Sequence, residues 1–270
     1  MIRIGHNPNT NMLPMFYFLS REQPLLEWVT AEPTGHNRML AEGRIDTAPI
    51  SAFSYGEHWS NYALFPDLSV STRGRVGSIL LFSKVPMAKL NGKLVALTSN
   101  SATSVNLLKI LLHRYYNVFP DYITMSGGLE EMFGHADAAL LIADVAIQAA
   151  AGSPSCYIYD LGEEWFNHTS YPMTYAIWAF PKQIIQSNPS ELRQVHNLLI
   201  KAKNQALENM DKITRHCVSM LGMSQSFWVD YFARFSYGLD LDFTQGMIRY
   251  YELCYEEGLL PNKPELNFWP

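Results

Sequence analysis

The sequence predicts an α/β protein of two lobes, with mostly parallel sheets flanked by helices and an all-helical C-terminal extension that packs on lobe one. Three observations favour this class. Short apolar runs alternate with segments of helical period over residues 2–181, which is typical of βαβ units. Only helical patterns follow Pro189. Residues 42–48 and 133–139 also resemble each other, since each has a helix end, a turn and an Asp that enters a strand.

The first series of elements precedes a turn at residues 90–93. Apolar runs predict strands at residues 3–5, 26–30, 45–48, 68–72 and 76–82. Helical periodicity predicts helices at residues 12–19 and 34–42, the second capped by Thr34 and ended by Gly43. The run at 76–82 is apolar on both faces, so we expect a central strand.

A second series begins after the turn, with a strand at residues 94–97 and a helix at 102–115 that carries an apolar face. Further strands are predicted at residues 122–125, 138–142, 156–160 and 175–180, and the C-terminal helices at 191–210, 213–220, 224–235 and 243–257. We therefore expect lobe one to comprise residues 1–83 and 176–270, lobe two to comprise residues 84–175, and a ligand cleft to lie between them.

Composition and charge argue against several classes of partner. The chain has 270 residues, is 48% hydrophobic and carries a net charge of −5, so a nucleic-acid partner is not expected. The most apolar window, residues 136–151, contains two Asp residues and is too short for a bilayer span. No membrane partner and no export signal are expected, which predicts a cytoplasmic protein. The widely spaced Cys156, Cys217 and Cys254 indicate reduced thiols rather than disulfides or a metal site.

Hydroxyl side chains are concentrated at residues 98–104, between a predicted strand and a predicted helix. Backbone N–H groups and hydroxyls at a helix N-terminus favour an anion. Ser99, Ser101, Ala102 and Thr103 are therefore candidates for binding a carboxylate. The alternative is an ordinary helix cap by Ser99 or Ser101.

Four more polar residues follow predicted strands or interrupt them. Asn11 is a candidate for hydrogen bonding to a substrate oxygen, or for capping the helix that begins at Met12. Ser51 and Ser78 are hydroxyls at strand ends or cleft faces. Asp144 follows the strand at 138–142, where it is either a cleft carboxylate or the cap of the next helix. Familiar catalytic motifs, such as HExxH, GxSxG and GxGxxG, are missing.

Several stretches taken in order resemble the chorismate dehydratases of the futalosine route to menaquinone, a family with the fold of type II periplasmic binding proteins. The likeness extends to about residue 180. The segments that carry it are Asn11-Met12-Leu13-Pro14, Asp46-Thr47-Ala48-Pro49-Ile50-Ser51, Val76-Gly77-Ser78-Ile79-Leu80-Leu81-Phe82-Ser83, Ala96-Leu97-Thr98-Ser99, Ser101-Ala102-Thr103-Ser104, Ala139-Leu140-Leu141-Ile142 with Asp144, and Tyr159-Asp160-Leu161-Gly162-Glu163-Glu164-Trp165.

The resemblance implies a hydro-lyase, a carbon–oxygen lyase that removes water from chorismate to give 3-[(1-carboxyvinyl)oxy]benzoate. It implies no cofactor and no metal, because aromatisation drives the reaction. It makes Asn11 and Ser78 the expected catalytic residues and Ser51, Ser99, Ser101, Ala102, Thr103 and Asp144 the expected substrate-binding residues. A carboxylate of the substrate is the expected base, so that catalysis depends on orientation and electrostatics.

The first loop departs from the family pattern at His6, Asn9 and Thr10, although Asn11 is kept. This loop is expected to border the ligand. Two alternatives therefore remain: an enzyme of the same fold that acts on a later futalosine-derived intermediate, and a non-catalytic protein that binds a small carboxylate.

Overall fold

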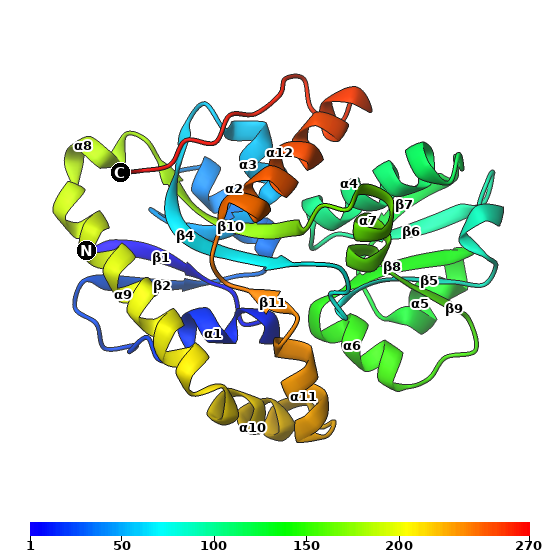
Figure 1. Ribbon diagram of the computed structural model, residues 1–270, viewed down its shortest axis with the longest axis horizontal. Coiled ribbons are helices and arrows are strands. Elements are labelled where there is room, and N and C mark those ends of the chain that lie inside the picture. Colours follow the sequence, from blue (N-terminus) through cyan, green and yellow to red (C-terminus); the bar gives the residue numbers. More distant parts are fainter.

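The computed structural model describes residues 1–270, and Figure 1 shows its two lobes side by side, with both termini in the first. The strands of the first lobe are β1 (Ile2–His6), β2 (Leu26–Thr30), β3 (Ala48–Ser51), β4 (Tyr62–Thr72), β10 (Met173–Pro181) and β11 (Phe235–Ser236). The strands of the second are β5 (Ile79–Ser83), β6 (Leu94–Thr98), β7 (Asp121–Met125), β8 (Ala138–Ile142) and β9 (Tyr157–Asp160).

Helices flank the sheets of both lobes. Those of the first lobe are η1 (Thr10–Met12), α1 (Leu13–Phe16), α2 (Pro33–Ala41) and α3 (Ala52–His58). Those that follow are η2 (Met87–Lys89), α4 (Ala102–Ile110), η3 (Leu111–Tyr115), α5 (Leu129–His135), α6 (Ala143–Ala151) and α7 (Leu161–Thr169). The C-terminal helices are α8 (Ile184–Ser187), α9 (Pro189–Glu208), α10 (Met210–Leu221), α11 (Gln225–Phe232) and α12 (Leu241–Glu256).

Strand pairing confirms the two-lobed α/β class and corrects the expected strand directions. The first lobe has a pair β1-β2 and a sheet ordered β11-β4-β10-β3, and the second has a sheet ordered β7-β6-β8-β5-β9. Strand pairs β1-β2, β6-β7 and β6-β8 are parallel, whereas β10 runs antiparallel to β3 and β4. The four-stranded sheet is antiparallel throughout, and the five-stranded sheet is mixed because β5 runs antiparallel to β8 and β9, so the sheets are not mostly parallel.

The chain crosses between the lobes twice, through the segment that joins β4 to β5 and through α7, which joins β9 to β10. Strand β5, expected in lobe one, pairs with β8 and β9 and therefore belongs to the second sheet. Its apolar side chains are buried on both faces, as expected of a strand inside a sheet. The first crossing consequently lies before Ile79, not after Ser83.

Other differences from the sequence-based expectations have local causes. Helix α2 has Pro33 in its first turn and no side-chain cap, so Thr34 does not cap it, although Gly43, with φ +69°, ends it as expected. Strand β4 begins at Tyr62, six residues before the expected strand at 68–72. It continues through Pro66 and through Asp67, whose φ is +59°, and these two residues interrupt its sequence pattern. Helix α3 was not expected.

The C-terminal helices pack on the first lobe, and three of them also reach the second. Helix α9 packs against α1 and β4. Helices α10 and α11 share an apolar cluster with Ile147 of α6, and α12 packs against both β10 and α4. The side chains of Trp228, Tyr231 and Tyr250 are at most 1% exposed, so this extension is part of the core.

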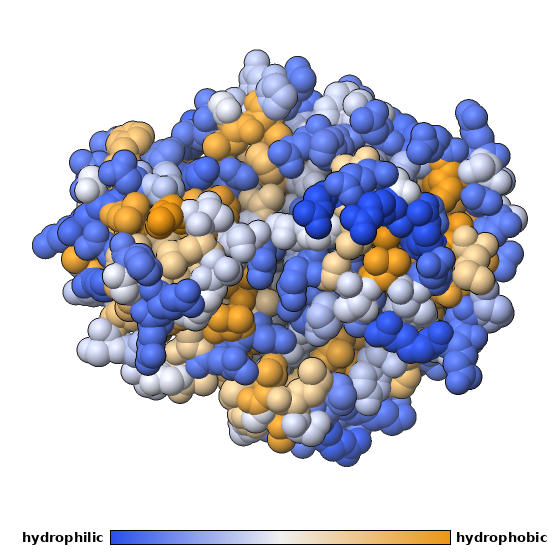
Figure 2. All heavy atoms as spheres, turned by 180° about the vertical axis from the view of Figure 1, so that it is seen from behind, coloured by the Kyte–Doolittle hydropathy of each residue, from blue (hydrophilic) through white to orange (hydrophobic).

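The face of the molecule that points away from the viewer in Figure 1 is mainly hydrophilic, with apolar side chains in separate groups (Figure 2). No helix combines the length and the apolar character that crossing a membrane requires.

Candidate functional site

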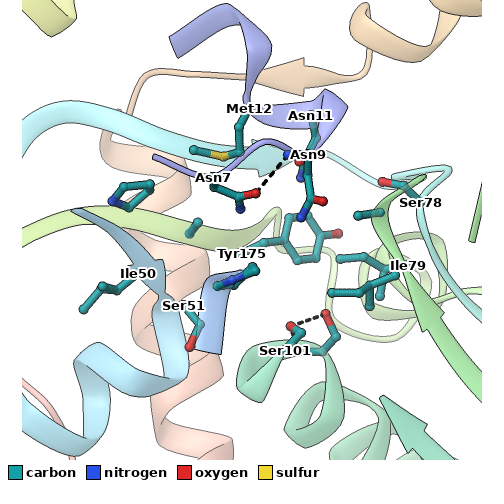
Figure 3. A pocket seen from close by; sticks show the side chains of 16 residues that line it. Asn7, Asn9, Asn11, Met12, Ile50, Ser51, Ser78, Ile79, Ser101 and Tyr175 are labelled. Atoms are coloured by element: carbon teal, nitrogen blue, oxygen red, sulfur yellow. Dashed lines mark hydrogen bonds between the residues drawn. The ribbon is translucent and has the colours of Figure 1, made fainter. Parts of the chain in front are cut away.

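A cavity of about 60 Å³ lies between the lobes (Figure 3). Asn7, Asn9 and Asn11 line it from the first loop, and Ser51 lines it from the end of β3. Ser78 and Ile79 line it where β5 begins, Ser101 and Ser104 line it at the start of α4, and Tyr175 lines it from β10. Four predicted site residues, Asn11, Ser51, Ser78 and Ser101, are therefore brought together.

Backbone contacts fix the position of Ser78 on both sides. The buried Asp160 carboxylate accepts hydrogen bonds from the N–H groups of Val76, at 3.0 Å, and Gly77, at 2.6 Å. Gly77 has φ +78°, a conformation that favours glycine. The carbonyl of Ser78 accepts a hydrogen bond of 2.7 Å from the N–H of Ala143. The Ser78 side chain therefore starts from a rigid backbone.

The hydroxyl of Ser78 has a defined donor. The Tyr231 hydroxyl donates to Ser78 Oγ at 2.9 Å, and burial raises the pKa of Tyr231 well above its usual range, so the phenol keeps its proton. A serine oxygen that accepts one hydrogen bond can still donate its own proton. Ser78 is therefore available to donate to a ligand in the cavity.

Asn11 lies in the helical turn η1 and does not cap the next helix, which begins without a side-chain cap. Its backbone carbonyl accepts a hydrogen bond of 2.9 Å from the Tyr237 hydroxyl. Its side-chain oxygen Oδ1 is buried and has no hydrogen-bond partner. A buried polar atom without a partner is rare, and Asn11 is one of the residues that line the cavity. Asn11 Oδ1 is thus an acceptor that the protein itself leaves unused.

The rest of the first loop shows how its unusual residues are used. Asn9 lines the cavity, and its N–H donates to Asn7 Oδ1 at 3.0 Å (Figure 3). His6 instead packs on Phe16 and Trp28. Burial lowers the pKa of His6 to about 4, so the ring is neutral at pH 7. His6 does not line the cavity, and Asn9 alone among the three departures does.

Thr10 and Asp144 connect the lobes beside the cavity. The N–H of Thr10 donates to the carboxylate of Asp144 at 3.2 Å. Helix α6 has no side-chain cap, so the capping alternative for Asp144 is wrong. Asp144 does not line the cavity either. Its position indicates a role in holding the lobes together.

The hydroxyl-rich turn contains both a helix cap and cavity-lining groups. Ser101 caps α4, because its Oγ accepts from the N–H of Ser104 at 3.1 Å, and it donates to Ser104 Oγ at 2.8 Å (Figure 3). The capping role of Ser101 is thereby confirmed, and both side chains still reach the cavity. Ser99 is exposed, does not cap α4 and does not line the cavity.

Thr103 lies beneath this turn and is 1% exposed. Its hydroxyl accepts from the N–H of Phe53 at 3.0 Å and donates to the carbonyl of Tyr175 at 3.3 Å. Both hydrogen bonds join elements of the scaffold, so the Thr103 side chain has a structural role. The backbone N–H groups of Ala102 and Thr103 belong to the first turn of α4. N–H groups in a first turn have no hydrogen-bond partner within the helix.

Ser51 provides the matching helix start in the first lobe. Its Oγ caps α3 by accepting from the N–H of Ser54 at 3.1 Å. The N-termini of α3 and α4 therefore approach the cavity from different lobes. Two such N-termini form a positive electrostatic environment for an anion.

Two lining residues, Asn7 and Tyr175, were not singled out from the sequence. Tyr175 is 7% exposed, and its hydroxyl forms a hydrogen bond with Thr72 Oγ1 at an O–O distance of 3.1 Å. It lies inside a run that predicts a strand, and nothing local distinguishes it from a core residue. Asn7 belongs to the polar loop after the first strand, a signal that could have identified it.

The polar groups of this cavity are amides and hydroxyls. No group of three or more His, Cys, Asp or Glu side chains is placed to hold a metal ion. The three cysteines are free thiols, and Cys217 and Cys254 are buried.

A family model described as menaquinone biosynthesis matches residues 2–256. The chain belongs to this family. A chorismate dehydratase of Thermus thermophilus is 32% identical over 245 residues, an alignment that covers 85% of this chain and 86% of that protein.

Solved structures show the same fold at lower identity. A protein from Archaeoglobus fulgidus superposes with a TM-score of 0.76 at 19% identity, covering 96% of this chain and 98% of its own. The periplasmic aliphatic sulphonate binding protein SsuA of Escherichia coli superposes with a TM-score of 0.68 at 15% identity, covering 100% and 92%. These neighbours confirm the periplasmic-binding-protein-like fold expected of this family member.

The cavity of this family member is small for an organic ligand. Its volume of about 60 Å³ compares with roughly 300 Å³ or more for usual small-molecule pockets. Hinge motion between lobes is the general way in which two-lobed proteins of this kind admit a ligand. The contact between Thr10 and Asp144 spans the lobes beside the cavity.

Proposed function

We propose that this protein is a chorismate dehydratase, a hydro-lyase that converts chorismate to 3-[(1-carboxyvinyl)oxy]benzoate and water. Family membership and the similarity to the Thermus thermophilus enzyme support this proposal. The observation that carries it is that Ser78 and Asn11 line one cavity, where the Ser78 hydroxyl accepts from Tyr231 and Asn11 Oδ1 has no partner in the protein.

The reaction breaks one C–H bond of the ring and the C–O bond of the neighbouring hydroxyl. The electron pair of the C–H bond forms the new ring double bond, and the proton and hydroxide leave as water. Ser78 donates a hydrogen bond to the leaving oxygen, where negative charge develops, and Asn11 Oδ1 accepts the hydrogen of the same hydroxyl. Preorganised groups of this kind stabilise a transition state because they need no rearrangement during the reaction.

The base is a carboxylate of the substrate itself. No His, Asp, Glu or Lys side chain lines the cavity. Burial raises the pKa of Tyr175 well above its usual range, which makes this phenol unsuited to accept the proton as a phenolate. The N-terminus of α4, which Ser101 caps, binds a substrate carboxylate together with the hydroxyls of Ser51 and Ser104, so the protein contributes orientation and electrostatics.

The partner proposed for the cleft is thus a small carboxylate, and no cofactor takes part. We place the protein in the cytoplasm, and the free thiols of Cys156, Cys217 and Cys254 fit a reducing compartment.

Incubation of the purified protein with chorismate tests this function. We expect ultraviolet absorption of an aromatic product and a mass lower than that of chorismate by one water. The controls are Asn11→Ala and a reaction without protein. Calorimetric binding of chorismate without turnover would instead indicate a binding protein. Neither binding nor turnover would favour an enzyme that acts on a later futalosine-derived intermediate.

A further inference from the structure

Two buried hydroxyl groups of the C-terminal extension form hydrogen bonds with the two proposed catalytic residues. Tyr231 of α11 donates to Ser78 Oγ, and Tyr237, directly after β11, donates to the backbone carbonyl of Asn11, both at 2.9 Å. Tyr231 is 1% exposed and Tyr237 is 2% exposed. Neither residue lines the cavity, so neither contacts a ligand there.

The ring of Tyr231 is held by aromatic neighbours on its own segment. It makes edge contacts with Trp228, Phe232 and Phe235, with ring centroids 5.6, 5.3 and 5.0 Å apart. Tyr237 stacks on Phe235 at 6.1 Å. One aromatic cluster therefore fixes both hydroxyls, and through them it reaches one residue of each lobe.

The hydrogen bond from Tyr231 also determines the direction of the Ser78 proton. Because Ser78 Oγ already accepts from Tyr231, its own O–H points elsewhere, and the cavity is the side that offers a ligand. Without Tyr231 the serine hydroxyl could rotate and donate to another acceptor. The contact from Tyr237 similarly fixes the turn that carries Asn11.

We propose that Tyr231 and Tyr237 are positioning residues for the dehydration, a role that rests on the proposed function. Their hydroxyls hold Ser78 and Asn11 in the orientation that the transition state requires. The alternative is that the two tyrosines only fill the core, in which case their rings matter and their hydroxyls do not.

Tyr231→Phe and Tyr237→Phe separate these roles, because each keeps the ring and removes the hydroxyl. We expect kcat with chorismate to fall about tenfold in each, the scale of one hydrogen bond, with KM nearly unchanged. The matched control is Tyr55→Phe. The Tyr55 hydroxyl is also buried and donates to the carbonyl of Glu265. Neither residue lines the cavity, so loss of this hydroxyl lowers the melting temperature and leaves kcat unchanged.

A double-mutant cycle with Ser78→Ala then tests the route of the effect. If Tyr231 acts through Ser78, adding Tyr231→Phe to Ser78→Ala lowers the residual turnover no further. Full turnover by a Phe variant would show that the replaced tyrosine is not a positioning residue. The proposed function would still hold in that case, because the wild-type protein converts chorismate. A wild-type protein that does not convert chorismate overturns both. If one variant does not fold, the other still decides.

Discussion

The two edges of the cavity differ in how their polar groups are used. On the first-lobe edge, Asn11 Oδ1 is buried without a partner. On the second-lobe edge, the hydroxyls of Ser101 and Thr103 each make two hydrogen bonds within the protein. The turn at residues 98–104 is rich in hydroxyl groups and precedes a predicted helix. The Ser101 and Thr103 hydroxyls nevertheless make their hydrogen bonds within the protein. Unused hydrogen-bonding capacity, rather than the density of polar residues, therefore distinguishes the edge that carries Asn11, which we propose to be catalytic.

The strongest test of this difference is Asn11→Ala. We expect turnover of chorismate to fall about 100-fold, the scale of losing one preorganised hydrogen-bonding group in a transition state. The melting temperature should stay unchanged, because Oδ1 makes no hydrogen bond within the protein. Steady-state kinetics and thermal melting measure both. A large loss of stability at unchanged turnover would reverse the roles assigned to the two edges.

Thr103→Val should show the opposite pattern. It leaves the buried N–H of Phe53 and carbonyl of Tyr175 without partners, which costs about 2 kcal/mol of stability. Affinity for the product should hardly change, because the hydroxyl does not face the cavity. Denaturant unfolding and calorimetric titration measure the two quantities. Weaker product binding at full stability would return Thr103 to the binding site.

Asp144→Asn tests the contact between the lobes. Burial raises the pKa of the Asp144 carboxyl, so the folded protein holds its proton more tightly than the unfolded chain does. The ionised group therefore costs stability at neutral pH, and this cost disappears as the pH falls through the raised pKa. The Asn variant should be more stable at pH 7 by about 1 kcal/mol or less.

Unfolding of wild type and Asp144→Asn over a pH series measures this difference. Their stabilities should converge as the pH falls toward the acid range. An advantage of the variant that grows at low pH would mean that the folded protein binds this proton less tightly than the unfolded chain. The amide keeps an oxygen that can accept from the Thr10 N–H, so the geometry of the contact is retained.

The smallest effect is expected for Ser99→Ala. Its side chain is exposed and bonds only to Asn100, with an O–O distance of 3.3 Å. Turnover, product affinity and melting temperature should all match the wild type. A clear loss of affinity would extend the binding site to the beginning of the turn.

Much of the fold could be predicted because local patterns determine it. Strands β2 and β8 occupy the expected residues, since both are short apolar runs bounded by turn or helix signals. Strand β4 was only partly predicted, because Pro66 and Asp67 interrupt its pattern and the pairing with β10 overrides this local signal. Strand directions could not be predicted, since they depend on where the chain crosses between lobes.

The candidate site was predictable to the extent that its residues follow strands. Asn11, Ser51 and Ser101 end or follow strands and line the cavity, whereas Ser78 was singled out because it interrupts an apolar run, and it lines the cavity just before β5. Tyr231 could not be found, because its aromatic neighbours indicate a core helix and only the folded chain places its hydroxyl on Ser78. Sequence patterns identify positions along one element, whereas the availability of a polar atom depends on contacts between distant elements.

Asp160 has a mechanical consequence for the motion of the lobes. Its carboxylate accepts hydrogen bonds from Val76 and Gly77 in one crossing and from Gly162 and Glu163 in the other. Both crossings are thus hydrogen-bonded to the same carboxylate. The two crossings are therefore mechanically coupled through one carboxylate, and Ser78 lies next in the chain to the coupled residues Val76 and Gly77.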